Sequence, residues 1–287
     1  MKVGFLGTGL MGNPMAKRIL TETDHQLTVY NRTISKTENL EAAGAKVEAE
    51  AKDVIANNDV LISMLTAYPQ TEEVYFSDDI DFTGKTIIQM GTITPDENVK
   101  LADKFESLGA EYLEAPVLAS IPQASEGELF ILVGGKKDLA EKFDSLLAVM
   151  GHEIIYFGEV GKASAAKLAL NQLIVTLTSA FSMSLGYLRE KEVDVEKFMG
   201  ILRSSALYAP TFDKKLDKML TRDFTNPNFP VKHLVKDVDL ITAQFGESGL
   251  DVSILNGIQQ ILKRSMDTGD ADMDYSALYN SIHPKSR

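Results

Sequence analysis

The 287-residue sequence contains no cysteine and no tryptophan. Without cysteine the chain cannot form a disulfide, a zinc–thiolate site, a cysteine-ligated iron–sulfur cluster or a thiol nucleophile. Its four histidines are scattered, and none belongs to a pair with metal-ligand spacing, so no metal site is expected. The lack of cysteine also fits a reducing compartment.

Basic residues are also few. The chain has 29 Lys and Arg and 41 Asp and Glu, so its formal charge is −12. Such a chain repels nucleic acids and anionic membrane surfaces, and we expect neither as a partner. No apolar run approaches the roughly 18 residues that a membrane span needs. The apolar opening at residues 3–6 is too short for a signal peptide. We therefore expect a cytoplasmic protein.

The first half of the chain alternates short β-rich segments with helical ones. Expected strands cover residues 3–6, 27–30, 60–65, 86–90, 111–113, 130–133 and 153–157, and expected helices cover 12–20, 38–43, 100–108 and 138–149. Strands that alternate with helices of this size predict βαβ units and a parallel sheet.

After residue 161 the pattern becomes entirely helical. Residues 162–192 hold no proline and one glycine and predict one long, mostly apolar helix. Further helices are expected at 195–203, 211–220, 234–248 and 253–267. We predict an α/β domain over residues 1–161 and an all-α domain over 162–287. The long helix joins them, and its apolar surface predicts burial in the second domain or in a dimer.

Residues 7–12 form a glycine-rich motif of the type G-x-G-x-x-G, with the sequence Gly7-Thr8-Gly9-Leu10-Met11-Gly12. The motif follows an expected strand and opens an expected helix, which is the context that dinucleotide binding requires. The first glycine permits a tight turn, the second lets the backbone approach a pyrophosphate, and the third allows close helix–strand packing. The helix N-terminus adds free N–H groups and a positive dipole end. The first domain is therefore predicted to be of the Rossmann type.

The end of the second expected strand indicates which nicotinamide cofactor is bound. NAD-binding chains usually place an acidic residue there for the ribose 2′-hydroxyl, whereas this chain has Asn31-Arg32-Thr33. A guanidinium with amide and hydroxyl donors favours a 2′-phosphate, and Lys36 can add charge. Residues 1–36 also carry five basic residues against two acidic ones. We expect NADP, with NADPH preferred over NADH.

At this point the sequence resembles the β-hydroxyacid dehydrogenases, a family that includes 3-hydroxyisobutyrate dehydrogenase and the plant glyoxylate/succinic semialdehyde reductases. Segments similar to family motifs occur in the family's order over most of the chain. They are residues 4–15, 64–66, 91–95, 114–117, 161–171 and 229–237.

The resemblance implies roles for individual residues. Lys167 matches the family's catalytic lysine and Asn171 its usual partner. Other matches imply cofactor contacts or a place near the substrate. The implied cofactor residues are Met64 and Leu65 after the third strand, Thr92 beside the nicotinamide and Lys236 in the second domain, and the implied substrate residues are Phe229 and Asp237.

One departure concerns the substrate. Where the family commonly reads Ser-Gly-Gly or Ser-Gly-Ser, this chain has Leu118-Ala119-Ser120. The hydroxyl that helps to hold a substrate carboxylate is missing at Leu118. The N–H groups of Ala119 and Ser120, or the Ser120 hydroxyl, are the expected substitutes. The neighbouring Glu114 is expected to be structural.

Lys167 and Asn171 lie four residues apart in the expected long helix and so share one face. A lysine partly withdrawn from water loses its ammonium form more easily, so its pKa falls toward the working pH. Such a group can give a proton to the alkoxide that develops as hydride reaches a carbonyl carbon, and its charge stabilises that alkoxide. Asn171 can orient the lysine or bond the substrate oxygen.

We therefore expect an NADPH-dependent reductase that converts a small aldehyde acid or keto acid, such as glyoxylate or succinic semialdehyde, into a hydroxyacid. Three alternatives stay open: a 3-hydroxyisobutyrate-type dehydrogenase that works in the oxidative direction, an imine reductase, and a non-catalytic NADP-binding scaffold. The lysine disfavours the last two, because imine reductases usually carry Asp or Tyr there and the scaffold relatives have lost it. The family also implies a homodimer or homotetramer.

Overall fold

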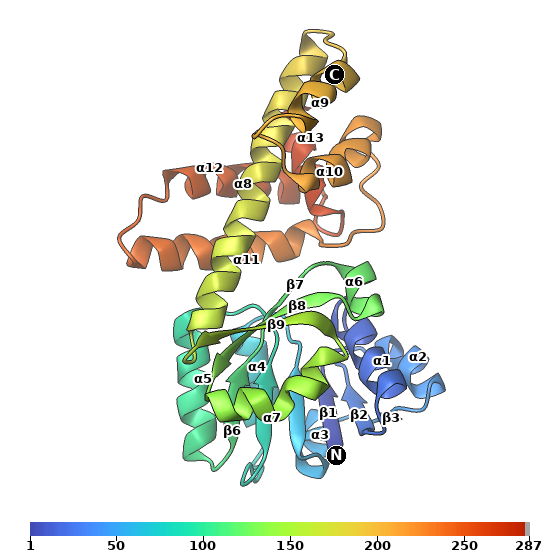
Figure 1. The fold of residues 1–287 in the computed structure, drawn as a ribbon, viewed down its shortest axis with the longest axis vertical. Helices are drawn as coiled ribbons and strands as arrows, with labels where there is room; N and C mark the ends of the chain where they lie inside the picture. The colour runs from blue at the N-terminus through green and yellow to red at the C-terminus, as the bar shows by residue number, and fades with distance from the viewer. Residues whose placement is uncertain (285–287) are drawn as a thin grey trace. The chain divides into compact units, whose positions relative to one another are not determined.

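The computed structural model describes residues 1–284 and divides into two compact units, Met1–Lys167 and Leu168–Arg287. The division falls inside the long helix, six residues beyond the boundary expected from the sequence. Figure 1 shows the first unit in blue to green and the helices of the second in yellow to red.

Within the described residues, nine strands of the first unit form one sheet with the order β3-β2-β1-β4-β5-β6-β8-β7, and β9 pairs with β8. The strands are β1 (Lys2–Leu6), β2 (Gln26–Tyr30), β3 (Lys46–Val47), β4 (Val60–Ser63), β5 (Thr86–Gln89), β6 (Glu111–Glu114), β7 (Val117–Leu118), β8 (Leu129–Gly135) and β9 (Gly151–Gly158).

The helices of the first unit cover both faces of this sheet (Figure 1). One apolar cluster joins the strands to α1, α6 and α7, and another joins them to α3, α4 and α5. Strands buried on both faces are apolar at nearly every position, as in β4, where all four residues are buried. The helices are α1 (Gly12–Glu22), α2 (Glu38–Ala42), α3 (Ala51–Asn57), α4 (Tyr68–Phe76), α5 (Pro95–Ser107), α6 (Ile121–Glu126) and α7 (Lys137–Ala148).

The Rossmann-type sheet is confirmed, but it is not parallel throughout. Strands β1 to β6 pair in parallel, whereas β8 runs antiparallel to both β6 and β7. Strands β6 and β7 run in the same direction, and the chain reverses between β7 and β8, which lies between them. The connection covers residues 119–128 and holds α6, which is shorter than the dozen or more residues that a parallel crossover needs.

The second unit is helical, as expected. Its residues continue α8 (Lys162–Glu190) and add α9 (Val195–Arg203), α10 (Pro210–Thr221), α11 (Val231–Glu247), α12 (Ser253–Asp267) and α13 (Leu278–Ile282). A separate core of buried apolar residues joins these helices around Phe181, Met219 and Leu234.

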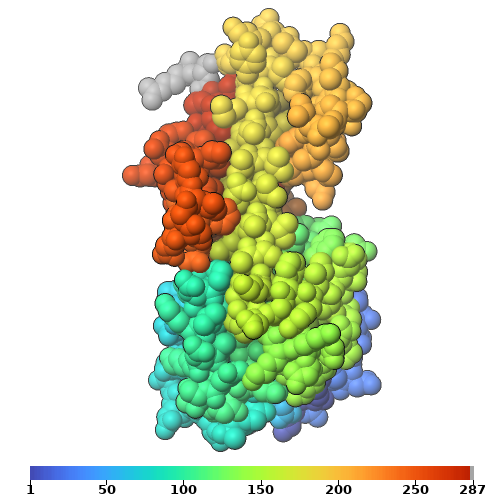
Figure 2. Space-filling view, turned by 60° about the vertical axis from the view of Figure 1, so that its left-hand side comes forward, coloured from blue at the N-terminus to red at the C-terminus, as the bar shows by residue number. Residues whose placement is uncertain are grey.

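Helix α8 is long and apolar, although it holds no continuous apolar run of 18 residues. By length and composition it could cross a membrane, because an 18-residue window has a mean hydropathy of 1.4. Scattered polar residues such as Asn171 hide this in the sequence. Core helices of globular proteins share this length and composition, and 44% of the window is buried within the protein. In Figure 2 the yellow surface of α8 is visible between other helices of the second unit.

Candidate active site

The glycine-rich motif occupies the turn between β1 and α1, and two of its glycines are required by the fold. Gly7 has φ = +101°, and a Cβ there would lie 2.5 Å from the carbonyl oxygen of Met64. A Cβ on Gly12 would overlap the carbonyl oxygen of Gly7. Both positions therefore exclude other residues for reasons internal to the protein.

Gly9 differs, because a Cβ at this position would meet no protein atom within 4 Å. Within the described chain, the N–H groups of Gly9, Leu10 and Met11 have no protein acceptor. Three free amides at the N-terminus of α1, beside open space, are suited to a phosphate anion. The turn thus fits a dinucleotide pyrophosphate.

The loop after β2 is tied to this turn by Asn31. The Asn31 Oδ1 accepts from Thr8 N at 3.2 Å, and Asn31 Nδ2 donates to the Thr33 carbonyl at 2.9 Å. The side chain predicted to contact the cofactor is thus used to hold two loops together. The side chains of Arg32, Thr33 and Lys36 are exposed, and they remain available for a 2′-phosphate.

Two more predicted cofactor segments lie at the same edge of the sheet. Because β1, β4 and β5 are parallel neighbours, the residues that follow their carboxyl ends meet there. Met64 and Leu65 follow β4, and Thr92 follows β5. The two loops approach closely, since a Cβ on Gly91 would lie 2.5 Å from the Leu65 carbonyl oxygen.

The loop Leu118-Ala119-Ser120 has an unusual backbone. Ala119 has φ = +137°, a region that favours glycine and strains an alanine. Ser120 N–H and Oγ both bond to Gln123 Oε1, at 3.3 and 2.6 Å, in a capping box at the start of α6. Of the expected carboxylate donors, only the Ala119 N–H lacks an acceptor in the described chain.

Lys167 lies in the second turn of α8, and its side chain is held among protein atoms. The residue is only 8% exposed, which is rare for a lysine. Ala163, one helical turn earlier, and Asn171, one turn later, lie on the same face and are 0% and 4% exposed. The lysine therefore belongs to a buried stripe of the helix and is not a solvated surface residue.

The start of α8 is fixed by Glu114, at the end of β6. Glu114 Oε1 accepts from Gly161 N at 2.7 Å and Ala163 N at 2.9 Å, and Oε2 accepts from Ser164 N at 3.3 Å. Burial raises the pKa of the Glu114 carboxyl, while the bonds from Ser164 and the other amides oppose the shift. Glu114 is structural, as expected, but the sequence did not indicate what it anchors.

In the second unit, Asn171 is bound to a buried acid on α11. Asn171 Nδ2 donates to Asp237 Oδ2 at 2.8 Å, and Lys236 Nζ lies 2.6 Å from Asp237 Oδ1. Asp237 is 3% exposed. The structure therefore brings together three residues that the family resemblance singles out, Asn171, Lys236 and Asp237.

Phe229 stands just before α11 and is flanked by a residue that the sequence analysis missed. Its ring stacks on His233, with centroids 6.4 Å apart. Burial lowers the pKa of His233, and Lys232 and Lys236 lower it further. The only sign of His233 in the sequence is its place one helical turn before Asp237.

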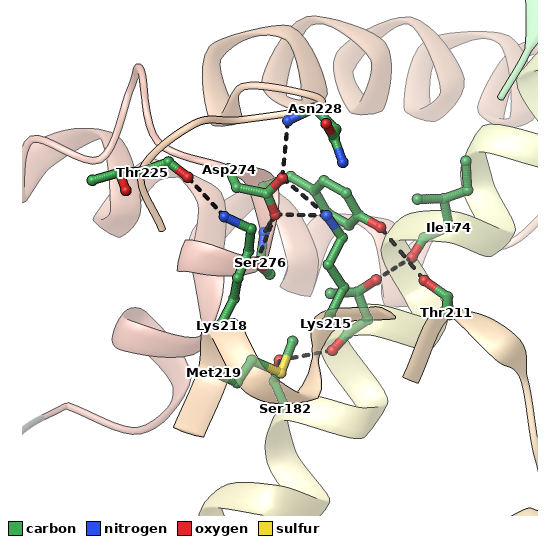
Figure 3. Close-up of polar contacts among 12 residues, drawn as sticks. Ile174, Ser182, Thr211, Lys215, Lys218, Met219, Thr225, Asn228, Asp274 and Ser276 are labelled. Carbon is green, nitrogen blue, oxygen red and sulfur yellow. Dashed lines mark hydrogen bonds and ion pairs between the residues drawn. The ribbon is translucent and has the colours of Figure 1, made fainter. Parts of the chain in front are cut away.

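The segment that carries Phe229 is held by a buried ion pair, which the sequence also did not reveal (Figure 3). Asp274 accepts from Lys215 Nζ at 2.8 and 2.9 Å and from the backbone N–H of Asn228 at 3.3 Å. The N–H of Tyr275 also donates to the Phe229 carbonyl at 2.9 Å. Asp274 thus connects α10 to the loop that precedes α11.

Comparison with known proteins extends over the whole fold. Residues 2–158 match the NAD-binding domain of 6-phosphogluconate dehydrogenase, and residues 161–282 match the NAD-binding family of NADP-dependent 3-hydroxyisobutyrate dehydrogenase.

In the described residues no group of His, Asp or Glu could hold a metal ion.

Individual relatives agree with these matches. The chain is 30% identical to glyoxylate/succinic semialdehyde reductase 1 of Arabidopsis thaliana over 98% of both chains. It is 31% identical to 2-hydroxy-3-oxopropionate reductase of Escherichia coli (strain K12), over 98% of this chain and 97% of that one. The fold is similar to that of Mycobacterium tuberculosis 3-hydroxyisobutyrate dehydrogenase with L-serine, with a TM-score of 0.86, 21% identity and 98% coverage of both chains. The chain belongs to the β-hydroxyacid dehydrogenase family and is an NAD(P)-dependent oxidoreductase.

Proposed function

We propose that the protein is an NADPH-dependent reductase of small carboxylate-bearing aldehydes or keto acids. The observation that carries the proposal is the buried Lys167, in the same unit as a dinucleotide-binding turn with three free amides. Relatives about 30% identical are named for glyoxylate, succinic semialdehyde and 2-hydroxy-3-oxopropionate. These are the substrates that we would test first.

The cofactor would lie along the edge of the sheet formed by the carboxyl ends of β1, β4 and β5. Amides of residues 9–11 bind its pyrophosphate, and the exposed Arg32 with Thr33 binds the 2′-phosphate. No carboxylate follows β2 directly to repel that phosphate. When bound, the nicotinamide supplies the hydride that reduces the carbonyl.

Lys167 donates the proton. As negative charge develops on the carbonyl oxygen, the Lys167 ammonium stabilises it and transfers a proton to it. Its place in a buried stripe of α8 excludes water from one side and limits its mobility. Asn171 donates its amide nitrogen to Asp237, so we assign the acceptor role in the reaction to its carbonyl oxygen.

The substrate carboxylate is proposed to bind at the loop of residues 118–120. The Ala119 N–H is the donor left available by the capping box of α6. Leu118 offers no hydroxyl, so this loop binds the carboxylate with fewer side-chain donors than a Ser-Gly-Gly loop would. We expect this difference to affect which acid is preferred rather than whether reduction occurs.

The function is tested by measuring NADPH oxidation with glyoxylate, succinic semialdehyde and 2-hydroxy-3-oxopropionate, and NADP⁺ reduction with the matching hydroxyacids. Lys167→Ala should lower kcat by about 100-fold or more, the usual contribution of general acid catalysis. Lys162→Ala, which removes an exposed lysine of the same helix, is the control. A Lys167→Ala enzyme within about threefold of wild type would contradict the assignment.

The cofactor preference is tested separately by the dissociation constants of NADPH and NADH. Arg32→Ala should weaken NADPH binding by about tenfold, because a charge-assisted bond is lost, and leave NADH binding unchanged. Lys17→Ala removes another exposed positive charge, on α1, and should alter neither. Tighter binding of NADH than NADPH, insensitive to Arg32, would overturn the preference.

A further inference from the structure

A buried acid, Glu114, binds the backbone amides at the start of the helix that carries the proposed proton donor. We propose that Glu114 is the positioning residue of Lys167: its carboxylate fixes the first turn of α8 and thereby the place and surroundings of the lysine. The inference rests on the proposed function, in which Lys167 is the proton donor. It assigns Glu114 no contact with substrate or cofactor.

The contact differs from an ordinary helix cap. Helices α5 and α9 are capped by Thr94 and Asp194, which directly precede them. Helix α8 is instead capped by a strand residue 47 positions before the nearest amide it binds. A local cap fixes a helix only to itself, whereas this one fixes α8 to the sheet.

The sheet is shaped to accept the carboxylate. Glu114 pairs with Gly134 on β8, and a Cβ at Gly134 would collide with Glu114 Oε1. Glu114 is 0% exposed, and a buried carboxylate is costly unless its oxygens are bonded. The three amides at the start of α8 provide those bonds. The acid and the helix end therefore depend on each other for a defined position.

The anchored turn leads directly to Lys167. Ala163, whose N–H is bound by Glu114 Oε1 at 2.9 Å, is four residues before Lys167 on the same helix face. That is a rise of about 6 Å. Loss of the anchor frees the first turn, and a shift of about 1 Å in a reacting group can lower a rate about 100-fold. Glu114→Gln also removes the negative charge at the start of the helix that carries the lysine.

Two variants disturb the anchor in independent ways. Glu114→Gln removes the charge and one acceptor while keeping the shape, and Gly134→Ala keeps the acid but displaces it by collision. Glu111→Gln is the matched control, because Glu111 lies on the same strand and its side chain is 47% exposed. All four proteins are compared in kcat, in KM for both substrates and in the pH profile of kcat, after thermal unfolding has confirmed that each is folded.

Positioning predicts a specific pattern. Both variants should lose about tenfold or more in kcat, with KM for NADPH within about twofold of wild type. The limb of the pH profile that Lys167 controls should be displaced in Glu114→Gln and unchanged in Glu111→Gln. The proposal is wrong if both variants fold and keep the wild-type kcat and pH profile while Lys167→Ala inactivates the enzyme. That outcome would leave the proposed reductase function intact.

A measurement independent of turnover separates failure of the positioning proposal from failure of the proposed function. Competitive acetylation with acetic anhydride across pH reports the reactivity of Lys167, and hydrogen exchange of the amides of residues 161–164 reports the anchor. In Glu114→Gln we expect altered acetylation of Lys167 and at least about tenfold faster exchange of those amides. If wild-type protein reduces no aldehyde acid, these changes still support positioning, and unchanged values still refute it.

Discussion

Asp237 Oδ2 accepts a 2.8 Å hydrogen bond from Asn171 Nδ2, and this bond fixes the orientation of the Asn171 amide. Both residues are buried, at 3% and 4% exposure. The amide nitrogen therefore faces α11, and the carbonyl oxygen is the end to which the proposed function assigns a role in the reaction. Asp237, which the family resemblance places near the substrate, thus also orients a neighbour of Lys167, the proposed proton donor.

The first prediction concerns this bond. Asp237→Ala should lower the free energy of unfolding by about 1–3 kcal/mol, because a buried amide is left without its acceptor, and should reduce kcat/KM. Asp237→Asn can still accept from Asn171 and should retain more activity than Asp237→Ala. Urea unfolding and steady-state kinetics measure both effects.

The control for this prediction is Asp239→Ala, which removes an exposed aspartate of the same helix that bonds Gln259. It should cost less than about 1 kcal/mol. Equal effects of Asp237→Ala and Asp239→Ala on unfolding and turnover would contradict the role assigned to the buried acid.

The second prediction separates two glycines of one motif. Gly12→Ala should destabilise the fold, because its Cβ would overlap the Gly7 carbonyl oxygen and overpacking typically costs about 1–3 kcal/mol. Gly9→Ala should leave the unfolding temperature nearly unchanged, since its Cβ meets no protein atom, but should weaken NADPH binding. Thermal unfolding without cofactor and fluorescence titration with NADPH measure the two effects. Equal destabilisation by both would refute the interpretation that Gly9 leaves space for a ligand.

Local signals in the sequence predicted much of the fold. Helices α9 and α12 begin and end where the sequence analysis placed them, because period and flanking residues define them locally. Helix α5 was expected to begin at residue 100 and begins at Pro95. The earlier start is explained by the capping box of Thr94 and Glu97 and by a proline in the first turn.

Long-range contacts account for what the sequence could not predict. Pattern and family resemblance predicted that Lys167 and Asn171 lie on one helix. The two acids that hold this helix are distant in the chain. Glu114 lies 49 residues before Ala163, whose amide it binds, and Asp237 lies 66 residues after Asn171. No local pattern records such pairings. The position of β8 is similar, because it depends on pairing with two strands, β6 and β7, that precede it in the chain.

The third prediction follows from the backbone of Ala119. An alanine at φ = +137° is strained, so Ala119→Gly should stabilise the protein by about 1 kcal/mol, the strain released less the entropy that glycine loses on folding. Ala45→Gly, at a buried alanine without positive φ, should destabilise it. A lower unfolding temperature for Ala119→Gly would contradict this account.

The fourth prediction concerns the exposed face of α8. Leu173, Met183 and Tyr187 are 52%, 62% and 65% exposed and lie within one arc of the helix. Since the family resemblance implies a dimer or tetramer, we expect a second copy of the chain to cover this face. Met183→Glu with Tyr187→Glu should then lower the mass measured by light scattering, while Ile254→Glu on α12, also 65% exposed, should not. An unchanged mass in the double variant would exclude this face as the interface.

The fifth prediction uses the ion pair of Figure 3, in which Lys215 and Asp274 have side chains 8% and 0% exposed. Lys215→Met leaves a buried carboxylate without its cation and should lower the free energy of unfolding by about 3–5 kcal/mol. Adding Asp274→Asn should recover part of this loss, because the uncompensated charge is removed while the bonds from Ser276 and Asn228 can partly persist. The exposed pair of Lys232 and Asp272 provides the control, and Lys232→Met should cost less than about 1 kcal/mol. If Lys215→Met and Lys232→Met unfold at the same urea concentration, the buried pair does not hold the segment that carries Phe229.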